Sequence, residues 1–243
     1  MEEVLRPENF CVSYTGERES LDTVKTQAAE IKKVLFNGQK PEPVKQAPCV
    51  KKNEAFKTSG QVQYVAQNGN FRKKGLEYTG ALEILKVILS YDYLWINLRV
   101  KGGAYGCMSG FKRNGESFLV SYRDPHLKRT LEVYQGVPDY IRAFEADERE
   151  MTKYIIGTIS NKDVPRTPQM QGSISKTAYF SNVTEDMLQK ERNQILGAQK
   201  EDIQKLAALV EAVLSDDQIC VVGSETAIEK AEDVFMEVKP LIG

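Results

Sequence analysis

A short run of the sequence, Leu98 to Gly106, combines residues that can bind a polar ligand with residues that bend the backbone. It reads LRVKGGAYG, so Arg99 and Tyr105 stand on either side of the Gly102-Gly103 pair. Arginine presents a charged fork of donors, and the hydroxyl of tyrosine is a neutral donor. Three interpretations are open: a loop that cradles a phosphate, a plain turn from helix to strand, or part of a site that holds a polypeptide.

The order of the neighbouring elements decides against the phosphate loop. Phosphate cradles lie between a strand and the N-terminus of a helix, where free N–H groups converge. Here the glycines follow an apolar, helix-like segment and precede a strand-like one, and their spacing matches neither GxGxxG nor GxxxxGKS. A helix end with Gly102 or Gly103 in a left-handed conformation explains the glycines but leaves Arg99 and Tyr105 unexplained.

Other residues that commonly do chemistry are scarce. His126 is the only histidine, which excludes a zinc site built from two or more histidines of this chain. It follows Asp124-Pro125, which suits the start of a helix, so we expect a surface histidine there and not a catalytic one. The four cysteines show no CxxC spacing, and we expect free thiols in a reducing compartment rather than disulfides or a metal site.

The composition is that of an ordinary globular protein. The 243 residues can bury a substantial core, 41% of them are hydrophobic, and the formal net charge is −1. This balance gives no electrostatic reason to expect nucleic acid or a membrane as a partner. The N-terminus has no apolar signal region, and charged residues interrupt the longest apolar stretch, Leu82 to Leu98, which is therefore expected to be a core helix.

Hydrophobic periodicity predicts the elements on either side of the glycine pair. Residues 79–98 are predicted to form a helix that is apolar nearly all round and hence buried, against a sheet. Two alternating runs, Tyr105–Lys112 and Ser117–Arg123, flank Asn114-Gly115, which is a strong signal for a β-hairpin.

Further elements complete one α+β layer. A half-buried strand, VQYVAQ, is expected before the helix, with Val62, Tyr64 and Ala66 on one face. After the hairpin the chain reads as helices, expected at 125–144 with a kink at Pro138, at about 147–160 behind a capping box, from 168, from 184, and over 200–214. The predicted fold is α+β, with one largely antiparallel sheet covered by helices.

The two ends of the chain repeat a strand-plus-helix plan. Residues 10–16 read as a strand and are followed by a helix ending near Gly38, and residues 219–223 and 225–243 repeat this order. We therefore expect residues 1–38 to be the terminal strand and helix of a preceding domain, and the chain to be a fragment. Three prolines and several charges mark residues 39–58 as a linker, which leaves 59–243 as a C-terminal α+β domain.

One family combines these features. LRVKGGAYG, a glycine-punctuated strand, the RNG turn and SYRDP together resemble the C-terminal part of insulinase/pitrilysin-type zinc metallopeptidases, and the presequence-protease subfamily most closely. The resemblance covers residues 59–243 in the order of elements and is dense over Leu98–Pro125. It implies a metallopeptidase/LuxS-like half-domain, and residues 1–38 then fit the end of the preceding one of four homologous domains.

The resemblance also implies roles for individual residues. In the family, the C-terminal half closes over a zinc-bearing N-terminal half, and an arginine and a tyrosine that match Arg99 and Tyr105 contact the substrate near the scissile bond. These two are the implied catalytic residues. A tyrosine hydroxyl that binds a developing oxyanion is worth about 3–4 kcal/mol in comparable sites. Gly102, Gly103 and Ala104 are implied as substrate-binding, because glycines let the backbone pass close to an extended peptide.

The chain departs from the family in one respect, because it has no HxxEH motif. Zinc, the family's cofactor, is therefore expected in the N-terminal half of the same polypeptide, and this chain alone is predicted to bind no metal and to be inactive. That half and unfolded peptides are the expected partners. The alternative is a non-catalytic subunit or scaffold relative of the same family. The expected location is the bacterial cytoplasm, with a mitochondrion or another organelle as the alternative.

Overall fold

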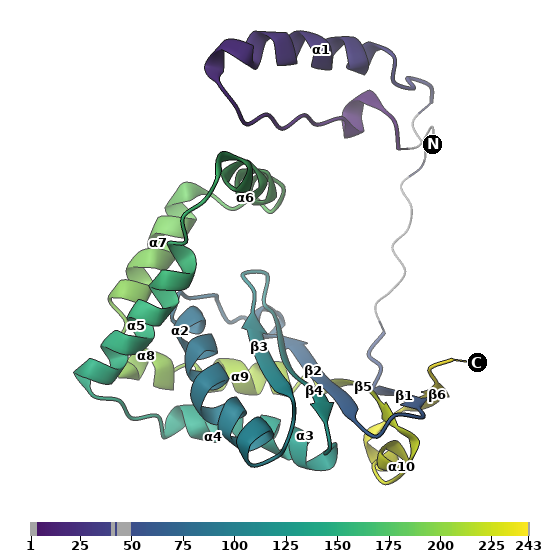
Figure 1. Cartoon of the computed structure of the whole chain (residues 1–243), viewed down its shortest axis with the longest axis vertical. Coiled ribbons are helices and arrows are strands. Elements are labelled where there is room, and N and C mark those ends of the chain that lie inside the picture. The colour runs from purple at the N-terminus through teal and green to yellow at the C-terminus, as the bar shows by residue number, and fades with distance from the viewer. Residues whose placement is uncertain (1–3, 40–41, 43–49, 243) are drawn as a thin grey trace. The chain divides into compact units, whose positions relative to one another are not determined.

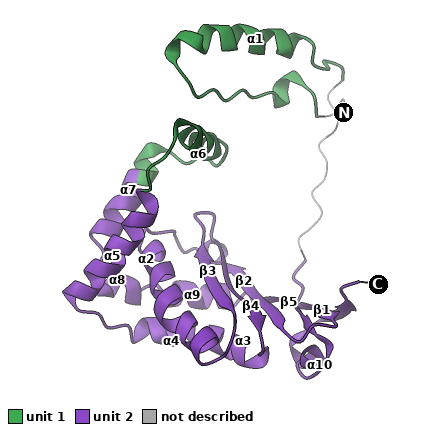
Figure 2. Ribbon diagram, in the orientation of Figure 1, with its two compact units in different colours: residues 1–49, 164–188 green, residues 50–163, 189–243 purple. Residues whose placement is uncertain are grey.

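The computed structural model describes residues 4–39, 42 and 50–242. The chain divides into two compact units, which Figure 2 shows in different colours: residues 1–49 with 164–188, and residues 50–163 with 189–243. In the first unit, helices α1 (Leu21–Lys33) and α6 (Pro168–Phe180) contain no buried residue. The second unit contains a sheet and a hydrophobic core, and it carries Arg99 and Tyr105.

A six-stranded sheet lies at the centre of the second unit (Figure 1). The order of its strands is β3-β4-β2-β5-β1-β6. Their bounds are β1 Glu54–Thr58, β2 Gln63–Asn70, β3 Gly106–Phe111, β4 Glu116–Asp124, β5 Gln218–Ser224 and β6 Glu237–Pro240. β1 runs parallel to β5 and β6, whereas the other neighbouring pairs are antiparallel. The predicted α+β fold with a largely antiparallel sheet is confirmed.

Helices pack on the sheet and on one another. Their bounds are α2 Ala81–Ile88, α3 Lys128–Gln135, α4 Val137–Arg142, α5 Glu148–Lys162, α7 Glu185–Leu196, α8 Lys200–Gln204, α9 Ala207–Leu214 and α10 Glu225–Glu229. α2, α3 and α9 contact β2 and β3, and the strand residues beneath the helices, such as Val65 and Leu119, are 1% exposed. The hydroxyl of Tyr134 in α3 donates to Val65 O at 3.1 Å. Burial of each large apolar side chain here stabilises the fold by about 1.5–3 kcal/mol.

The helix that leads to the glycine pair changes its winding along its length. α2 continues into two π-helical segments, η4 (Leu89–Tyr93) and η5 (Trp95–Val100). This agrees with the predicted helix over 79–98. The prediction that the helix is buried nearly all round is wrong, because Tyr91 and Trp95 are 71% and 39% exposed. π-helical turns are uncommon and are frequent at functional sites.

β3 and β4 form the predicted hairpin. Gly115 N donates to Lys112 O, and Lys112 N donates to Glu116 O, both at 2.8 Å. Gly115 has a φ of +90°, a conformation that L side chains rarely adopt, which explains why glycine follows Asn114 in the turn.

The start signals of the later helices are confirmed. Asp147 and Glu150 form the predicted capping box of α5, in which Glu150 N donates to Asp147 Oδ1 at 2.8 Å. Thr167 and Thr184 accept hydrogen bonds from the backbone three residues further on, at 3.3 and 3.2 Å. The single helix expected over 125–144 is divided into α3 and α4.

The apolar residues whose alternation predicted β2, such as Tyr64, lie on the face of the strand opposite the core. Tyr64 is 46% exposed, whereas Gln63, Val65 and Gln67 are buried on the opposite face. The two glutamines have partners there: Ser224 N donates to Gln63 Oε1 at 2.8 Å, and the Gln67 side chain donates to a backbone carbonyl of α9. Hydrogen bonding lets polar side chains occupy core positions, and a hydrophobic pattern cannot reveal it.

The prediction of a C-terminal helix over 225–243 is wrong. The helix α10 ends at Glu229, and the chain then forms β6, which pairs in parallel with β1. Pairing with the open side of β1 outweighs the weak helix preference of these residues. β1 itself lies inside the segment 39–58 that was expected to be a linker, and the three prolines of that segment fall outside the described residues.

At the N-terminus, the helix expected after residue 16 is confirmed as α1. The prediction of a strand over residues 10–16 is wrong, because these residues join no strand ladder of the described chain and a strand needs a partner for its main-chain hydrogen bonds. None of the described helices is long and apolar enough to cross a bilayer.

Candidate functional site

The chain turns sharply where η5 leads into β3. Gly103 N donates to Arg99 O and Ala104 N donates to Leu98 O, both at 2.9 Å, and these bonds close the end of the helix. Gly103 has the left-handed φ, +79°, that the helix-end interpretation requires of one glycine. At Gly102 a Cβ atom would lie 2.4 Å from Leu98 O, so the position has no room for a side chain. The two glycines are needed for different reasons.

This turn brings Arg99 and Tyr105 together. Arg99 Nη1 donates to the backbone O of Tyr105 at 2.9 Å. The guanidinium carbon lies 4.2 Å from the centroid of the Trp95 ring, a cation–π contact that orients the group. The other N–H groups of Arg99 donate to no residue in the described part of the chain, and they remain free for a ligand.

Tyr105 stands at the surface among charged and aromatic groups. It is 58% exposed, and its backbone N donates to Arg123 O at 3.3 Å. Its ring centroid lies 5.8 Å from the guanidinium carbon of Arg99, 5.7 Å from that of Arg123, and 5.6 Å from the Tyr122 ring. Across residues 4–39, 42 and 50–242, nothing hydrogen-bonds to its hydroxyl. The donor of the site is thus available to a ligand.

The turn itself presents little surface to a ligand. Gly102 and Ala104 are buried, and Ala104 is 3% exposed, whereas Gly103 is exposed. Of the three residues predicted to bind substrate, Gly103 alone offers its backbone at the surface. Gly102 and Ala104 support the turn from inside.

The strand that follows the turn has a free side. β3 is the edge strand of the sheet, and β4 is its partner on the other side. No strand within the described ranges pairs with the outer side of β3. A free edge can bind an extended peptide through main-chain hydrogen bonds. The edge begins at Gly106, directly after Tyr105.

Sequence reasoning did not identify Trp95 or Arg123 as parts of this cluster. The spacing of four residues between Trp95 and Arg99 is a signal that could have found the first, because such residues are neighbours on a helix surface. For Arg123 the available signal was the predicted hairpin, whose first run begins at Tyr105 and whose second run ends at Arg123. Arg123 reaches Tyr105 because the hairpin places the end of β4 opposite the start of β3.

Cys107 lies on β3 next to the cluster, and burial raises the pKa of its thiol to about 11, although nearby Arg99 acts to lower it. At pH 8 we expect iodoacetamide to alkylate this thiol about 100-fold more slowly than the same thiol in urea, because the thiolate is the reactive form. The rate should rise about tenfold per pH unit up to pH 10. Mass spectrometry of the peptide that contains Cys107 measures this rate, and a rate independent of pH would contradict a half-buried, protonated thiol.

His126 has the surface position that was predicted. It is exposed, and its backbone N donates to Asp124 Oδ1 at 2.9 Å just before α3 begins. In the part of the chain that the structure describes, no three His, Cys, Asp or Glu residues are grouped so as to hold a metal ion. The residues present do not fit a catalytic zinc site, which requires three protein ligands.

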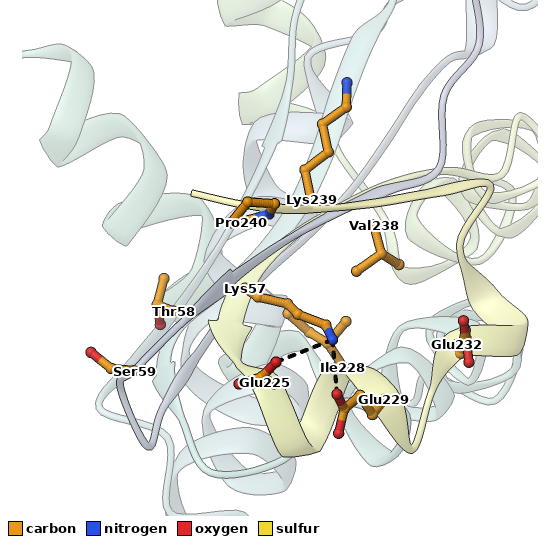
Figure 3. A pocket seen from close by; sticks show the side chains of 10 residues that line it. All are labelled: Lys57, Thr58, Ser59, Glu225, Ile228, Glu229, Glu232, Val238, Lys239 and Pro240. Carbon is orange, nitrogen blue, oxygen red and sulfur yellow. Dashed lines mark hydrogen bonds and ion pairs between the residues drawn. The ribbon is translucent and has the colours of Figure 1, made fainter. Parts of the chain in front are cut away.

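A separate pocket of about 620 Å³ lies at the far edge of the sheet from β3, where β1, β6 and α10 meet (Figure 3). Lys57 extends to two carboxylates, with Nζ 2.8 Å from Glu229 Oε1 and 3.4 Å from Glu225 Oε1. The hydrogen bond to Glu229 is the main reason why the pKa of Lys57 is raised. Because these charges satisfy one another, we assign the pocket no binding role.

Comparison with known proteins identifies relatives along most of the chain. The family described as the PreP C-terminal domain matches residues 53–225. Protein HypA of Clostridium perfringens is 44% identical over 234 residues, which cover 96% of this chain and 24% of HypA. The chloroplastic/mitochondrial presequence protease 1 of Arabidopsis thaliana is 34% identical over 192 residues, which cover 77% of this chain and 18% of that protein. The chain spans about a quarter or less of the length of these curated relatives.

Solved structures show the same fold at low sequence identity. The peptidase M16 inactive domain from Pseudomonas fluorescens has a TM-score of 0.56 at 17% identity, over 92% of this chain and 52% of that one. Pitrilysin has a TM-score of 0.55 at 17% identity, over 83% of this chain and 22% of that one. The predicted resemblance is confirmed: the chain belongs to the PreP C-terminal domain family, and pitrilysin and a peptidase M16 inactive domain share its fold.

Proposed function

We propose that this chain is the substrate-clamping, C-terminal part of a zinc metalloendopeptidase that degrades unstructured peptides in a closed chamber. One observation carries the proposal: an exposed tyrosine hydroxyl without a described partner stands next to a guanidinium group that has free N–H groups. Membership of the PreP C-terminal domain family supports it.

In this proposal Tyr105 donates to the carbonyl oxygen of the scissile peptide bond. The hydrogen bond strengthens as negative charge develops on that oxygen, which is how a neutral donor contributes to acyl-transfer catalysis. Arg99 donates to a neighbouring carbonyl of the substrate, and its contact with Trp95 fixes its direction. Gly103 leaves room for the substrate backbone, with Gly102 and Ala104 supporting the turn.

The free edge of β3 explains a preference for unfolded peptides. A segment can add to a strand edge only when its own main-chain groups are unpaired and its backbone is extended. The added strand would run past Tyr105, since β3 begins at the next residue. A folded protein offers few such segments.

Zinc, the nucleophilic water and the general base are assigned to an N-terminal half of the same polypeptide, because this chain does not fit a zinc site. Residues 1–38 are then the end of a preceding domain, 39–58 connect the two domains and contribute β1, and 59–243 form most of the last domain. The bacterial cytoplasm is the proposed location.

The full-length protein that this proposal requires is expected to cleave an unstructured, fluorescence-quenched peptide. Chelation of zinc by 1,10-phenanthroline should abolish the cleavage, and added zinc should restore it, because the nucleophile depends on the metal. A folded protein that contains the same cleavage sequence should stay intact. If the full-length protein with bound zinc leaves the peptide uncut, the proposal fails.

A non-catalytic subunit or scaffold is the second candidate function. Two solved neighbours that share the fold are described as inactive peptidase domains. This candidate predicts that the full-length protein leaves the peptide uncut with or without zinc, so the same assay separates the two functions.

A further inference from the structure

Arg123 lies at an irregularity of the sheet. Gln63 pairs with Asp124 and Val65 pairs with Ser121, so β4 has one residue more than β2 between these two pairs. Arg123 lies in this bulge and has a φ of +49°, in the left-handed region that residues other than glycine rarely adopt. Bulges re-aim side chains, and strained backbone of this kind clusters at ligand-binding sites.

The bulge places the Arg123 side chain beside Tyr105. Its guanidinium carbon lies 5.7 Å from the centroid of the Tyr105 ring, and its backbone O accepts from Tyr105 N at 3.3 Å. The guanidinium carbon of Arg99 lies 5.8 Å from the same centroid. One exposed ring therefore contacts two guanidinium groups, which come from η5 and from β4.

Neither of these arginines forms an ion pair with a carboxylate of the described residues, although both are exposed. The carboxylate of Asp124, the next residue after Arg123, belongs to a side chain that is 1% exposed and accepts from His126 N at 2.9 Å and from the Thr130 hydroxyl at 2.7 Å. Other arginines of the chain do have carboxylate partners: Arg6, Arg113, Arg142 and Arg192. The surface around Tyr105 thus carries two like charges that a ligand can neutralise.

We propose that Arg123 is a further substrate-binding residue, which binds a carboxylate of the peptide held at Tyr105. A guanidinium fork matches a carboxylate with two parallel hydrogen bonds, and relief of the repulsion between Arg99 and Arg123 adds to the preference. The carboxylate belongs to an acidic side chain or to the C-terminus of the peptide. This inference rests on the proposed peptide-cleaving function.

The competing explanation is that Arg123 only packs against the Tyr105 ring and steadies it. In that case the charge of the substrate makes no difference, and loss of Arg123 affects every peptide alike. The two explanations therefore predict different ratios of kcat/KM between the carboxylate and neutral versions of a peptide. The overall rate of cleavage does not distinguish them.

The experiment uses the full-length protein with zinc and a peptide whose cleavage site has been mapped. Glu and Gln versions are compared at each of the positions next to the cleavage site, all with an amidated C-terminus, and a short version is compared with free and amidated C-termini. Arg123→Asn removes the guanidinium and suits the left-handed backbone, whereas Arg123→Lys keeps the charge. Arg149→Gln in α5 is the matched control, because Arg149 is likewise exposed and forms no ion pair within the described residues.

The wild type is expected to favour the carboxylate version at one position about tenfold in kcat/KM, the size of a charge-assisted hydrogen bond. Arg123→Asn should bring this ratio to about one, whatever its effect on kcat/KM for the neutral, amidated peptide. Arg123→Lys should keep part of the preference, and Arg149→Gln all of it. A preference among Glu and Gln versions identifies a side chain as the source, and one between free and amidated ends identifies the C-terminus.

Two results overturn the inference alone: a wild type that treats matched peptides alike, or an Arg123→Asn variant that loses activity on both peptides and keeps their ratio. Peptide binding by fluorescence anisotropy separates these results from a failure of the proposed function. If the wild type neither binds nor cleaves the neutral peptide, the proposed function is wrong, and the inference about Arg123 falls with it.

Discussion

Replacement of Tyr105 by phenylalanine is expected to lower kcat of the full-length protein about 100-fold on an unstructured peptide, with KM within about threefold of wild type. The substitution removes one hydroxyl and keeps the ring, so the contacts of the ring with Arg99, Arg123 and Tyr122 remain. The loss should fall on kcat because the hydrogen bond is stronger to the developing oxyanion than to the ground-state carbonyl. Steady-state kinetics with a quenched peptide measures both parameters.

Tyr122→Phe is the matched control for this prediction. Tyr122 lies 5.6 Å away, ring to ring, and its hydroxyl also lacks a hydrogen-bond partner among the described residues. Loss of that hydroxyl should leave kcat within about threefold of wild type if it does not touch the reacting carbonyl. If Tyr105→Phe changes KM and not kcat, Tyr105 is a docking contact and has no role in the chemical step.

Gly102→Ala is expected to lower the stability of the second unit by about 3 kcal/mol. A Cβ atom at this position would lie 2.4 Å from Leu98 O and 3.0 Å from Asn97 O, and these backbone atoms cannot swing aside as a flexible side chain can. The end of η5 must shift, and Arg99 must shift with it. The midpoint of thermal unfolding should fall by about 8 °C for a unit of this size, and peptide cleavage should fall as well.

Gly103→Asn is the matched control for Gly102→Ala. It tests whether the loss of stability comes from a steric clash at Gly102 or from any substitution in the turn. Gly103 has a φ of +79°, and a Cβ atom there would meet nothing closer than Pro125 Cγ at 3.6 Å. Asparagine tolerates left-handed backbone better than other side chains, so we expect a cost below about 1 kcal/mol. An equal or larger loss of stability in Gly103→Asn would show that steric room at Gly102 does not control the turn.

Local signals predicted much of the fold. The Asn114-Gly115 turn and the capping box of Asp147 and Glu150 depend on residues a few positions apart, and both are present in the structure. Features that depend on distant partners were not predictable in this way. β6 forms because β1 offers a free side, and the sequence around Val238 carries no sign of that pairing.

The candidate site also combines features set by neighbouring residues, which could be predicted, with features set by distant residues, which could not. Arg99 and Tyr105 lie six residues apart, and a single turn brings them into contact, so the local sequence could indicate the pair. Burial of Gly102 and Ala104 could not be predicted, because it depends on the core beneath the turn. Arg123 joins the cluster through the hairpin, which the local sequence predicted, and through a bulge against β2, which depends on a strand distant in the sequence.

The π-helical winding of η4 and η5 sets the direction in which Arg99 leaves the helix. A π turn accommodates one residue more than an α turn, and one residue corresponds to about 100° of rotation around the axis. If the same residues were wound as a regular α-helix, Arg99 would lie about 100° further around the axis, relative to the buried Leu89, for each π turn lost. The alignment of Arg99 with Tyr105 therefore depends on the winding of this helix as much as on the identity of its residues.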